Sequence, residues 1–462
     1  RYGIKPLYYS FQGNRFAFAS ENKAIITHPL FRRKLNKAAL LEYLTFQNIF
    51  TDQTLLSDIH TLPAGHWMQV DLADPDGRRF HQYWDFDFRE PENPESDAEY
   101  VEELGRLFVQ AVQRQLVGDV EIGAYLSGGI DSGSITAVAS ASLPHMKSFT
   151  CGFDLSSASG LELAFDERKQ AESLSALFKT ELYEMVLKSG DMERSLTRIA
   201  WHLEEPRVGQ SYPNFYAAQL ASKFVKIVLA GVGGDELFAG YPWRYGHTAS
   251  SRHFEKFIDE YYLNWQRLVS NAQLEQLMSP VLTDVEGIRT RDIFRDVFPL
   301  NRRQDASNAS DLINFSLYFE SKTFLHSLLI VEDKLSMANG LETRVPMLDN
   351  DLVDFSMQIP LHLKLRQDEQ ATRIDENQPG SKSLQYFLQT GNGKLIFREL
   401  AARYVPDNVA QGRKQGFSAP DASWFRGESI EFLAKTVLDP QSPMSEVLNM
   451  KVVESLVGEH IS

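Results

Sequence analysis

The sequence has a single cysteine, Cys151, among 462 residues. One cysteine cannot form a disulfide within the chain, which excludes small extracellular folds held together by disulfides. A reducing compartment, the cytoplasm, is therefore the expected location. No apolar stretch approaches the roughly 20 residues that a helix needs to cross a bilayer. We accordingly expect no membrane partner.

Runs of lysine and arginine are also absent, and the formal net charge is −15. A nucleic-acid groove needs a basic surface, so we expect no nucleic-acid partner. The chain contains no Gly-x-x-x-x-Gly-Lys-Ser/Thr segment, the phosphate loop that carries a lysine in many ATPases. If the protein uses ATP, cleavage between the β and γ phosphates is thus not the expected reaction.

Apolar residues make up 43% of the chain, which is enough to bury a large core, and the length predicts two or more domains. Residues 1–88 alternate short β-rich runs with turns, and residues 7–11 and 15–19 form a plausible hairpin. Residues 89–97 are rich in proline and acidic side chains, and we read them as a linker. The predicted domains are therefore 1–88 and 98–462.

From residue 98 the pattern alternates predicted helices with short apolar runs. The expected helices are 98–115, 133–142 and 167–179, and the expected strands are 122–126, 148–153, 182–187 and 225–230. This rhythm predicts an α/β fold with a doubly wound, mostly parallel sheet that binds ligands at the carboxyl ends of its strands. Beyond residue 241 the pattern becomes helical, and an apolar stripe from Phe254 to Leu268 predicts a helix face in the core.

The most informative segment is Ser127-Gly128-Gly129-Ile130-Asp131-Ser132, between a predicted strand and a predicted helix. Its glycines lack Cβ atoms, so backbone N–H groups can close around a polyphosphate, and the helix start adds its positive dipole end. Ser127 and Ser132 supply hydroxyl donors. Asp131 cannot bind phosphate directly and is read as a ligand of a bridging Mg²⁺ ion. The segment predicts a pyrophosphate cradle, although a lone glycine turn after a strand is usually a simple tight connection.

A second carboxylate, Asp235, follows three closely spaced glycines at the end of the predicted strand 225–230. It should reach the same sheet edge as Asp131. Two acidic groups over one phosphate site repel each other unless a cation lies between them, so we predict that both bind the same Mg²⁺. The alternative is that Asp235 caps the N-terminus of a helix.

Residues 230–241 (Ala-Gly-Val-Gly-Gly-Asp-Glu-Leu-Phe-Ala-Gly-Tyr), 332–349 and 413–417 (Arg-Lys-Gln-Gly-Phe) are further motifs. Together with residues 127–132, and in this order, they resemble the glutamine-hydrolysing asparagine synthetases, and Ser-Gly-Gly-x-Asp-Ser resembles the loop of the N-type ATP pyrophosphatases. The resemblance covers nearly the whole chain. It implies a sheet of the adenine nucleotide α-hydrolase type, preceded in residues 1–88 by part of an α+β glutaminase domain of the Ntn type.

The resemblance also implies a reaction, in which the side-chain carboxylate of aspartate attacks the α-phosphorus of MgATP and ammonia then displaces AMP from the acyl-adenylate. Asp131, Asp235 and Lys414 match the family's catalytic positions, with both aspartates on Mg²⁺ and Lys414 near the phosphates. The implied nucleotide contacts are Leu126, Ser127, Gly128, Gly129, Asp131, Ser132, Cys151, Gly152 and Gly231.

Acceptor-substrate contacts are implied less directly. Glu332 and Asp333 lie close to the region that lines the family's acceptor pocket, but a charged stretch of this kind is more often a solvated helix turn. Arg344 could hold a carboxylate through two parallel bonds or could tie down Asp349.

The sequence departs from the family pattern in two places. The family's glutaminase begins with a catalytic cysteine, whereas this chain begins at Arg1, so we expect a missing N-terminal half and ammonia rather than glutamine as the nitrogen donor of this chain alone. Val232 stands where asparagine synthetases commonly carry an acidic residue. An intramolecular amide former that resembles β-lactam synthetases or lasso-peptide cyclases is therefore the alternative enzyme, and a non-catalytic nucleotide-binding subunit is a third hypothesis. A homodimer is possible.

Overall fold

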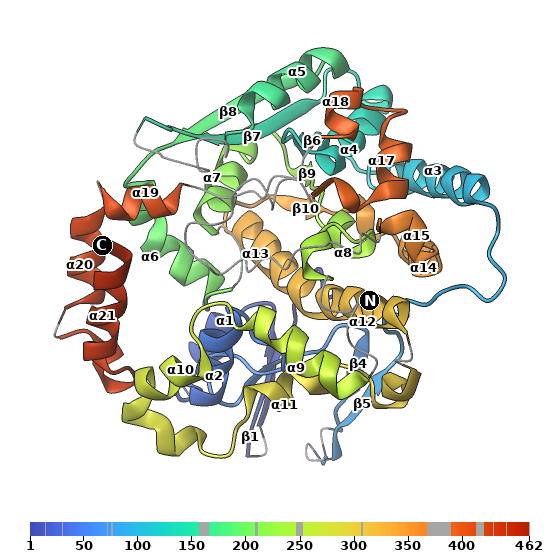
Figure 1. The fold of residues 1–462 in the computed structure, drawn as a ribbon. Coiled ribbons are helices and arrows are strands. Elements are labelled where there is room, and N and C mark those ends of the chain that lie inside the picture. Colours follow the sequence, from blue (N-terminus) through green and yellow to red (C-terminus); the bar gives the residue numbers. More distant parts are fainter. Residues whose placement is uncertain are drawn as a thin grey trace.

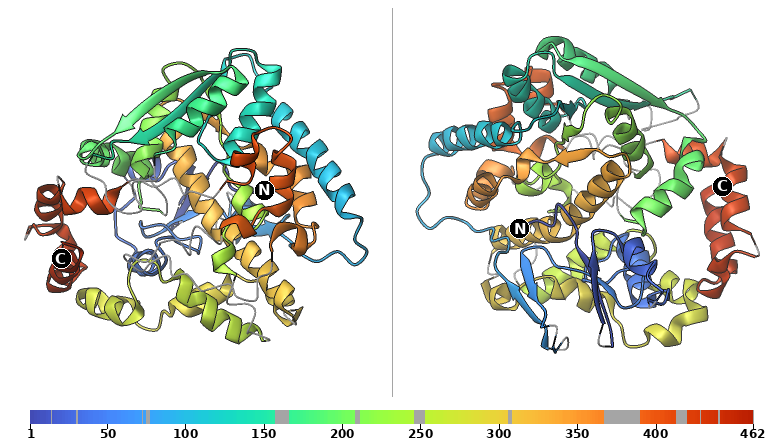
Figure 2. Two further views of the ribbon diagram at one scale, coloured as in Figure 1. Left: turned by 45° about the horizontal axis from the view of Figure 1, so that its top comes forward. Right: turned by 180° about the vertical axis from the view of Figure 1, so that it is seen from behind.

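The computed structural model describes residues 1–462 except 14, 30, 72, 75–76, 157–165, 208–210, 246–252, 306–307, 367–389, 413–419, 428, 440 and 462. Residues 1–88 lie at the opposite end of the molecule from strands β7 and β8, and helix α13 runs between the two parts (Figure 1). The view from behind in Figure 2 shows the same separation.

The larger part is built on a five-stranded, fully parallel sheet with the order β10-β9-β6-β7-β8. Its strands are β6 (Ile122–Tyr125), β7 (Lys147–Phe153), β8 (Glu181–Leu187), β9 (Ile227–Leu229) and β10 (Glu342–Arg344). The four strands expected from the sequence are confirmed. Strand β10 was not expected, because it is three residues long and lies within a region whose pattern is helical.

Helices cover both faces of this sheet. Ile227 and Leu229 pack into the same core as helices α3 (Asp97–Arg114), α4 (Ile130–Ser142) and α5 (Arg168–Phe178), whereas Val228 packs with α7 (Ser211–Ala221). Successive side chains of a strand point to opposite faces, so these helices lie on opposite sides. The chain winds from β6 outward to β8, crosses through α6 (Asp191–Leu203) and α7, and returns to β9 on the other side of β6. The predicted doubly wound parallel sheet is therefore confirmed.

The described part of residues 1–88 combines small antiparallel sheets with two α-helices. The elements are β1 (Tyr8–Gln12), β2 (Arg15–Ala19), α1 (Asn22–Ile26), α2 (Lys37–Phe46), β3 (Ile59–Thr61), β4 (His66–Gln69) and β5 (Arg79–Gln82). Strands β2, β1 and β3 form one sheet, and β4 pairs with β5. The predicted hairpin is confirmed as the β1–β2 pair.

Buried charges join residues 1–88 to the parallel-sheet part. Glu204 accepts hydrogen bonds from the backbone N–H groups of Asn22 (2.9 Å) and Lys23 (2.6 Å), the first two residues of α1. The same carboxylate pairs with the buried Lys334 of α13. A carboxylate at a helix N-terminus is favoured by the exposed N–H groups and the helix dipole. The contact therefore fixes how α1 sits on the rest of the protein.

The chain after α7 is mainly helical apart from β10, and it surrounds the sheet and the N-terminal part. The elements include α8 (Gly234–Leu237), α9 (Phe254–Trp265), α10 (Asn271–Leu277), α11 (Thr290–Asp296), α12 (Ala309–Phe319), α13 (Leu325–Met337), α14 (Asn350–Ser356), α15 (Leu361–Lys364), α17 (Leu395–Ala401), α18 (Asp407–Ala410), α19 (Asp421–Arg426), α20 (Ile430–Val437) and α21 (Met450–Ile461). The predicted core stripe is confirmed along α9, but Leu268 lies beyond the helix and is 41% exposed. In the part of the chain that the structure describes, no helix is long and apolar enough to cross a membrane.

The segment that joins the two parts packs against α15. Phe88 is fully buried, and both carboxylate oxygens of Glu90 accept from the backbone N–H of Leu361 at 3.2 and 3.3 Å. The Nζ of Lys364 lies 5.0 Å from the centre of the Phe88 ring and is completely buried. Burial lowers the pKa of Lys364 to about 7, although nearby Glu90 opposes the change. This amine therefore destabilises the fold when it is charged.

We expect Lys364→Met to stabilise the protein, by about 5 °C in thermal midpoint at pH 6. The folded pKa lies below the unfolded value, so the unfolded chain binds the proton more tightly, and wild-type stability rises between about pH 7 and pH 10.5. The gain from Lys364→Met should consequently shrink from pH 6 to pH 9. Thermal melts at both pH values measure this gain, and Lys451→Met, at an exposed position of α21, is the control. An equal shift at both pH values would contradict the assignment.

Candidate functional site

The two glycine turns meet at the carboxyl edge of the parallel sheet. The first follows β6 and the second follows β9, and these strands are neighbours. The connections from β6 and to β9 run to opposite sides of the sheet, so this is the point where the winding reverses. Open α/β sheets bind ligands in the crevice at such a switch point.

The first turn is held by its two serines. The Ser127 and Ser132 hydroxyls lie 2.8 Å apart, and the backbone N–H of Ser127 donates to the Ser132 hydroxyl at 3.1 Å. The N–H of Gly129 donates to the Ser127 hydroxyl, also at 3.1 Å. Gly129 then forms the N-cap of α4, so Asp131 lies in the first turn of that helix. A Cβ at Gly128 would come within 2.6 Å of the Gln170 Cβ, which leaves no room for a side chain.

The second turn places Asp235 in the first turn of α8, whose N-cap is Gly233. The alternative role of Asp235 as a helix cap is therefore wrong. The glycines of this turn pack directly on Asp131: a Cβ at Gly231 would lie 3.1 Å from the Asp131 Cβ, and one at Gly234 would lie 2.5 Å from its Oδ1. Val232 is partly buried and packs against the main core.

Asp131 and Asp235 converge on the side chain of Lys394. The Lys394 Nζ lies 2.6 Å from Asp131 Oδ2 and 2.6 Å from Asp235 Oδ1. Lys394 is only 5% exposed. Burial by itself disfavours the ammonium, but the two carboxylates outweigh it and raise the pKa of Lys394. The predicted meeting of the two acids is confirmed, and a charged lysine lies between them.

Lys394 was not predicted from the sequence. It lies at the N-cap of α17 with a left-handed backbone (φ 57°), after the segment Gly391-Asn392-Gly393. A cation is normally unfavourable at the positive end of a helix dipole, and lysine has no preference for a left-handed conformation. A lysine that combines both features indicates a functional placement, but both features are visible only in the structure, and the sequence shows only a lysine after a glycine-rich segment.

The Asp131–Asp235 pair fits a divalent cation held partly by phosphate. Among the described residues no group of three or more His, Cys, Asp or Glu side chains could hold a metal ion. Magnesium commonly takes one or two carboxylates and completes its shell with phosphate oxygens and water. The ammonium between the two acids shows that positive charge is stabilised at this point. Their role as Mg²⁺ ligands stays a prediction.

Because a Cβ at Gly234 would lie 2.5 Å from Asp131 Oδ1, Gly234→Ala should displace that carboxylate. We expect catalytic turnover to fall by about 100-fold, since small misplacements at a reacting centre have effects of this size. Gly458→Ala on α21, where a Cβ would meet nothing within 4 Å, is the matched control and should leave turnover unchanged. Steady-state kinetics with thermal melts check both variants. Unchanged turnover in Gly234→Ala would mean that the Asp131 position does not matter.

The other predicted nucleotide contacts lie on and after β6 and β7. Leu126 is buried, and its N–H donates to the Phe149 carbonyl at 2.9 Å. Cys151 is buried on β7, and burial raises the pKa of its thiol to about 12, which disfavours the thiolate. A Cβ at Gly152 would lie 2.3 Å from Asp166 Oδ1, so this position has no room for a side chain. These residues line neighbouring strands, and their contact with nucleotide stays a prediction.

The predicted acceptor-substrate residues on α13 are not a solvated turn. Asp333 is buried and pairs with Lys5 of the N-terminal part, and burial raises its pKa. Glu332 accepts from the hydroxyls of Thr343 (3.1 Å) and Ser336 (3.3 Å), and burial raises its pKa as well. Neither residue forms a hydrogen bond or ion pair with Asp131, Asp235 or Lys394 within the described residues.

Arg344 does not tie down Asp349, and that alternative is wrong. Its guanidinium donates to the carbonyls of Gln115 and Val117, both at 2.7 Å, and to Glu342 at 2.8 Å. Asp349 instead caps α14 and accepts from Arg114. The Arg344 head group therefore contacts the chain that leads into β6, at the opposite end of that strand from Asp131.

Lys414, the predicted phosphate lysine, lies outside the described residues. The flanking residues are described. Gly412 accepts from Arg398 Nη1 at 2.8 Å, and Asp421 accepts from the Tyr212 hydroxyl at 2.7 Å. The role of Lys414 stays a prediction.

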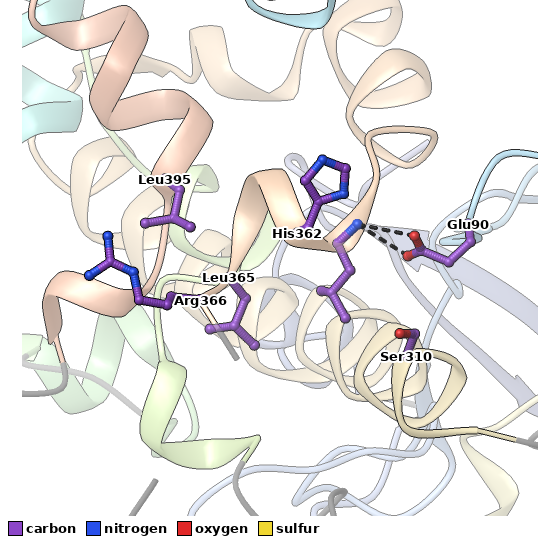
Figure 3. A pocket seen from close by; sticks show the side chains of 7 residues that line it. Glu90, Ser310, His362, Leu365, Arg366 and Leu395 are labelled. Atoms are coloured by element: carbon purple, nitrogen blue, oxygen red, sulfur yellow. Dashed lines mark hydrogen bonds between the residues drawn. The ribbon is translucent and has the colours of Figure 1, made fainter. Parts of the chain in front are cut away.

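A cavity of ≈ 500 Å³ has Leu395, the residue after Lys394, in its wall (Figure 3). It is lined by Glu90, Ser310, Leu361, His362, Leu365, Arg366 and Leu395. Figure 3 shows the Glu90 carboxylate turned toward the backbone N–H of Leu361, with which it forms hydrogen bonds. None of the predicted site residues that the structure describes lines this cavity.

Comparison with known families assigns two segments of the chain. A family described as asparagine synthase matches residues 103–462, and one described as a glutamine amidotransferase domain matches residues 1–84. These two matches lie on either side of the predicted linker.

Individual relatives carry related names. Asparagine synthetase [glutamine-hydrolyzing] 1 of Bacillus subtilis is 27% identical over 96% of this chain and 68% of its own length. Putative asparagine synthetase [glutamine-hydrolyzing] 2 of Methanocaldococcus jannaschii is 32% identical over 65% of this chain and 55% of its own. A solved NH3-dependent NAD synthetase from Campylobacter jejuni is 16% identical over 46% of this chain and 95% of its own, with a TM-score of 0.21. The fold assignment rests on the strand order described above.

Proposed function

Because the chain belongs to the asparagine synthase family, we propose that it uses ATP to activate the side-chain carboxylate of aspartate and joins it to ammonia. The carboxylate attacks the α-phosphorus of ATP, the α–β bond breaks, and pyrophosphate leaves. Ammonia then attacks the acyl-adenylate carbonyl, and AMP leaves with the electron pair of the acyl–oxygen bond. The observation that carries the proposal is the convergence of Asp131, Asp235 and Lys394 at the edge between β6 and β9.

The leaving pyrophosphate must be stabilised as it gains negative charge. We assign its binding to the turn of residues 127–132, where Ser127 and Ser132 offer hydroxyls and α4 begins. Mg²⁺ held by Asp131 and Asp235 would neutralise phosphate charge. The Lys394 ammonium lies at the same two carboxylates and is buried, so its attraction to phosphate is stronger there than it would be in water. Lys414 is proposed as a second lysine at the phosphates.

The absence of a lysine within the turn itself favours α–β cleavage. In the common phosphate loop that lysine reaches the β and γ phosphates. Here Lys394 arrives from a distant segment and contacts the two acids at the helix start. We therefore expect AMP and pyrophosphate as products rather than ADP and phosphate.

Val232 favours one alternative. Valine can neither accept a proton nor bind a metal, and it stands in the turn directly before Gly233. The acidic residue that asparagine synthetases commonly carry here is missing, which favours a synthetase that forms an amide within one substrate, as β-lactam synthetases and lasso-peptide cyclases do, and whose amine loses its proton to a group elsewhere. This second function keeps the same nucleotide chemistry and changes the acceptor.

An assay of nucleotide products tests the proposal. The protein is incubated with MgATP, aspartate and ammonium chloride, and ³¹P NMR distinguishes AMP plus pyrophosphate from ADP plus phosphate. Ammonium is used so that the result is independent of glutamine hydrolysis. We expect AMP, pyrophosphate and asparagine in equal amounts. No pyrophosphate with aspartate, but pyrophosphate when another carboxylate substrate takes its place, would favour the alternative acceptor, and no nucleotide turnover with any carboxylate tested would favour a non-catalytic binding subunit.

A further inference from the structure

Arg398 is a buried cation that the proposed reaction does not use. It lies on α17, one turn after Lys394, and is 5% exposed. Burial lowers the pKa of its guanidinium, and Asp131 and Asp235 oppose that change through their charges. Arginine remains protonated in proteins, so a second positive charge is fixed near the two acids.

The guanidinium joins two separate segments through backbone carbonyls. Nε donates to the Gly393 carbonyl at 2.9 Å, and Nη1 donates to the carbonyls of Ala410 (3.0 Å) and Gly412 (2.8 Å). Gly393 directly precedes Lys394, and Gly412 directly precedes the Arg413-Lys414 pair in the sequence. One side chain thus holds the peptide that carries Lys394 against a second part of the chain.

The Gly393 peptide has little freedom to settle elsewhere. A Cβ at Gly393 would lie 2.2 Å from the Ala239 carbonyl oxygen, so this turn packs directly on the glycine turn that carries Asp235. The Lys394 N–H donates to the Phe238 carbonyl at 3.0 Å. The Lys394 backbone is therefore fixed from one side by residues 238–239 and from the other side by Arg398.

Arginine suits this role better than lysine would. Its planar head group offers several N–H donors in fixed directions, so it can bind three carbonyls at once. A lysine at this position keeps the charge but cannot reproduce the fixed fork. The Arg398→Lys variant therefore keeps the positive charge and removes only the hydrogen-bond geometry of the guanidinium.

We propose that Arg398 is a positioning residue, which fixes the backbone that carries Lys394 beside Asp131 and Asp235 and acts on the leaving pyrophosphate only through the Lys394 ammonium. This rests on the proposed function. It predicts that Arg398→Lys lowers kcat for pyrophosphate release by about 100-fold, the effect of a small misplacement at a reacting centre. The KM for ATP should change by less than about 3-fold, because the lost interaction belongs to the transition state.

A double-mutant cycle distinguishes positioning from a general structural role. Arg398→Lys is made in the wild type and in Lys394→Met. If Arg398 acts through Lys394, the exchange costs less than about 3-fold in kcat once Lys394 is gone, because the two effects are not additive. A second loss of about 100-fold in that background would overturn the proposal.

Arg303→Lys is the matched control. Arg303 also binds backbone carbonyls, those of Arg295 at 3.0 Å and Phe298 at 3.0 and 3.2 Å, and it is partly buried away from the site. Its exchange should leave kcat unchanged in both backgrounds. Thermal midpoints of all variants are measured alongside, and Arg398→Gln, which loses the charge as well, is the second variant. Loss of the folded protein in both Arg398 variants would assign the residue a structural role and overturn the proposal.

The failure of this inference is distinguishable from the failure of the proposed function. If Lys394→Met alone keeps full turnover, the reaction assigned to the site is wrong. If Lys394→Met loses turnover while Arg398→Lys keeps it, the site stands and only the positioning role is wrong.

Discussion

Asp131→Asn is expected to lower the rate of pyrophosphate release by about 10²- to 10³-fold or more, the loss seen when one electrostatic group is removed from an active site. Asparagine has nearly the same shape as aspartate but carries no charge and is a poor ligand for Mg²⁺. Asp235→Asn should have a similar effect, since the two carboxylates share one cation.

The fold should survive Asp131→Asn. Lys394 keeps its second partner, Asp235, at 2.6 Å, so no buried charge is left alone. The measurement is the initial rate of pyrophosphate release, with thermal melts of each variant. Asp354→Asn, which removes a half-exposed partner of Arg1, is the control and should leave the rate unchanged. Full activity of Asp131→Asn would refute the assigned role of the pair.

Lys394→Met should have the second large effect, a loss of turnover of about 10²- to 10³-fold. It also has a consequence that does not depend on turnover. Without the ammonium, Asp131 and Asp235 face each other with two like charges, which is costly unless protons or a cation neutralise them. A divalent cation should then bind without nucleotide, because the residue that competes with it is gone.

Titration with Mn²⁺ in the absence of ATP, followed by electron paramagnetic resonance, measures this. We expect Mn²⁺ to bind Lys394→Met at least about 10-fold more tightly than wild type, which corresponds to about 1.4 kcal/mol. Lys147→Met, which removes a lysine paired with exposed Glu121, is the control. Equal Mn²⁺ affinity in Lys394→Met and wild type would mean that the two acids do not form a cation site.

Local patterns predicted most of the sheet because each strand is a short apolar run between a helix and a turn. The hairpin of β1 and β2, the strands β6 to β9 and the core face of α9 follow from such patterns. Strand β10 has no such signature. Its three residues join β9 only because a long helical excursion brings them back to the sheet edge, and no local pattern records that return.

The candidate site was predictable in part for the same reason. Asp131 and Asp235 each follow a glycine turn at the end of a strand, and parallel strands bring such turns to one edge. Lys394 comes from a segment more than 150 residues after Asp235 along the chain and carries no motif of its own. The repulsion between the two acids calls for a cation between them, but nothing in the sequence identifies a lysine of the chain as a group that lies there.

Arg344 and Asp333 show that a motif can also suggest a substrate contact where the residue has a partner within the chain. Both are charged residues in motifs that resemble functional ones, and both are engaged within the chain, Arg344 with carbonyls before β6 and Asp333 with Lys5. The sequence shows residue type and spacing, whereas the partner of a buried charge depends on tertiary packing. The role of a charged residue in a motif can therefore be assigned only when the group that it contacts is known.

A crystal structure with Mn²⁺ and α,β-methylene-ATP tests the central claim most directly, because anomalous scattering identifies the position of the metal. We predict one Mn²⁺ bound by Asp131 and Asp235 and by phosphate oxygens, with the β and γ phosphates on residues 127–132 and the Lys394 ammonium on phosphate. A triphosphate bound elsewhere, with Lys394 still between the two aspartates and no metal on them, would contradict the account.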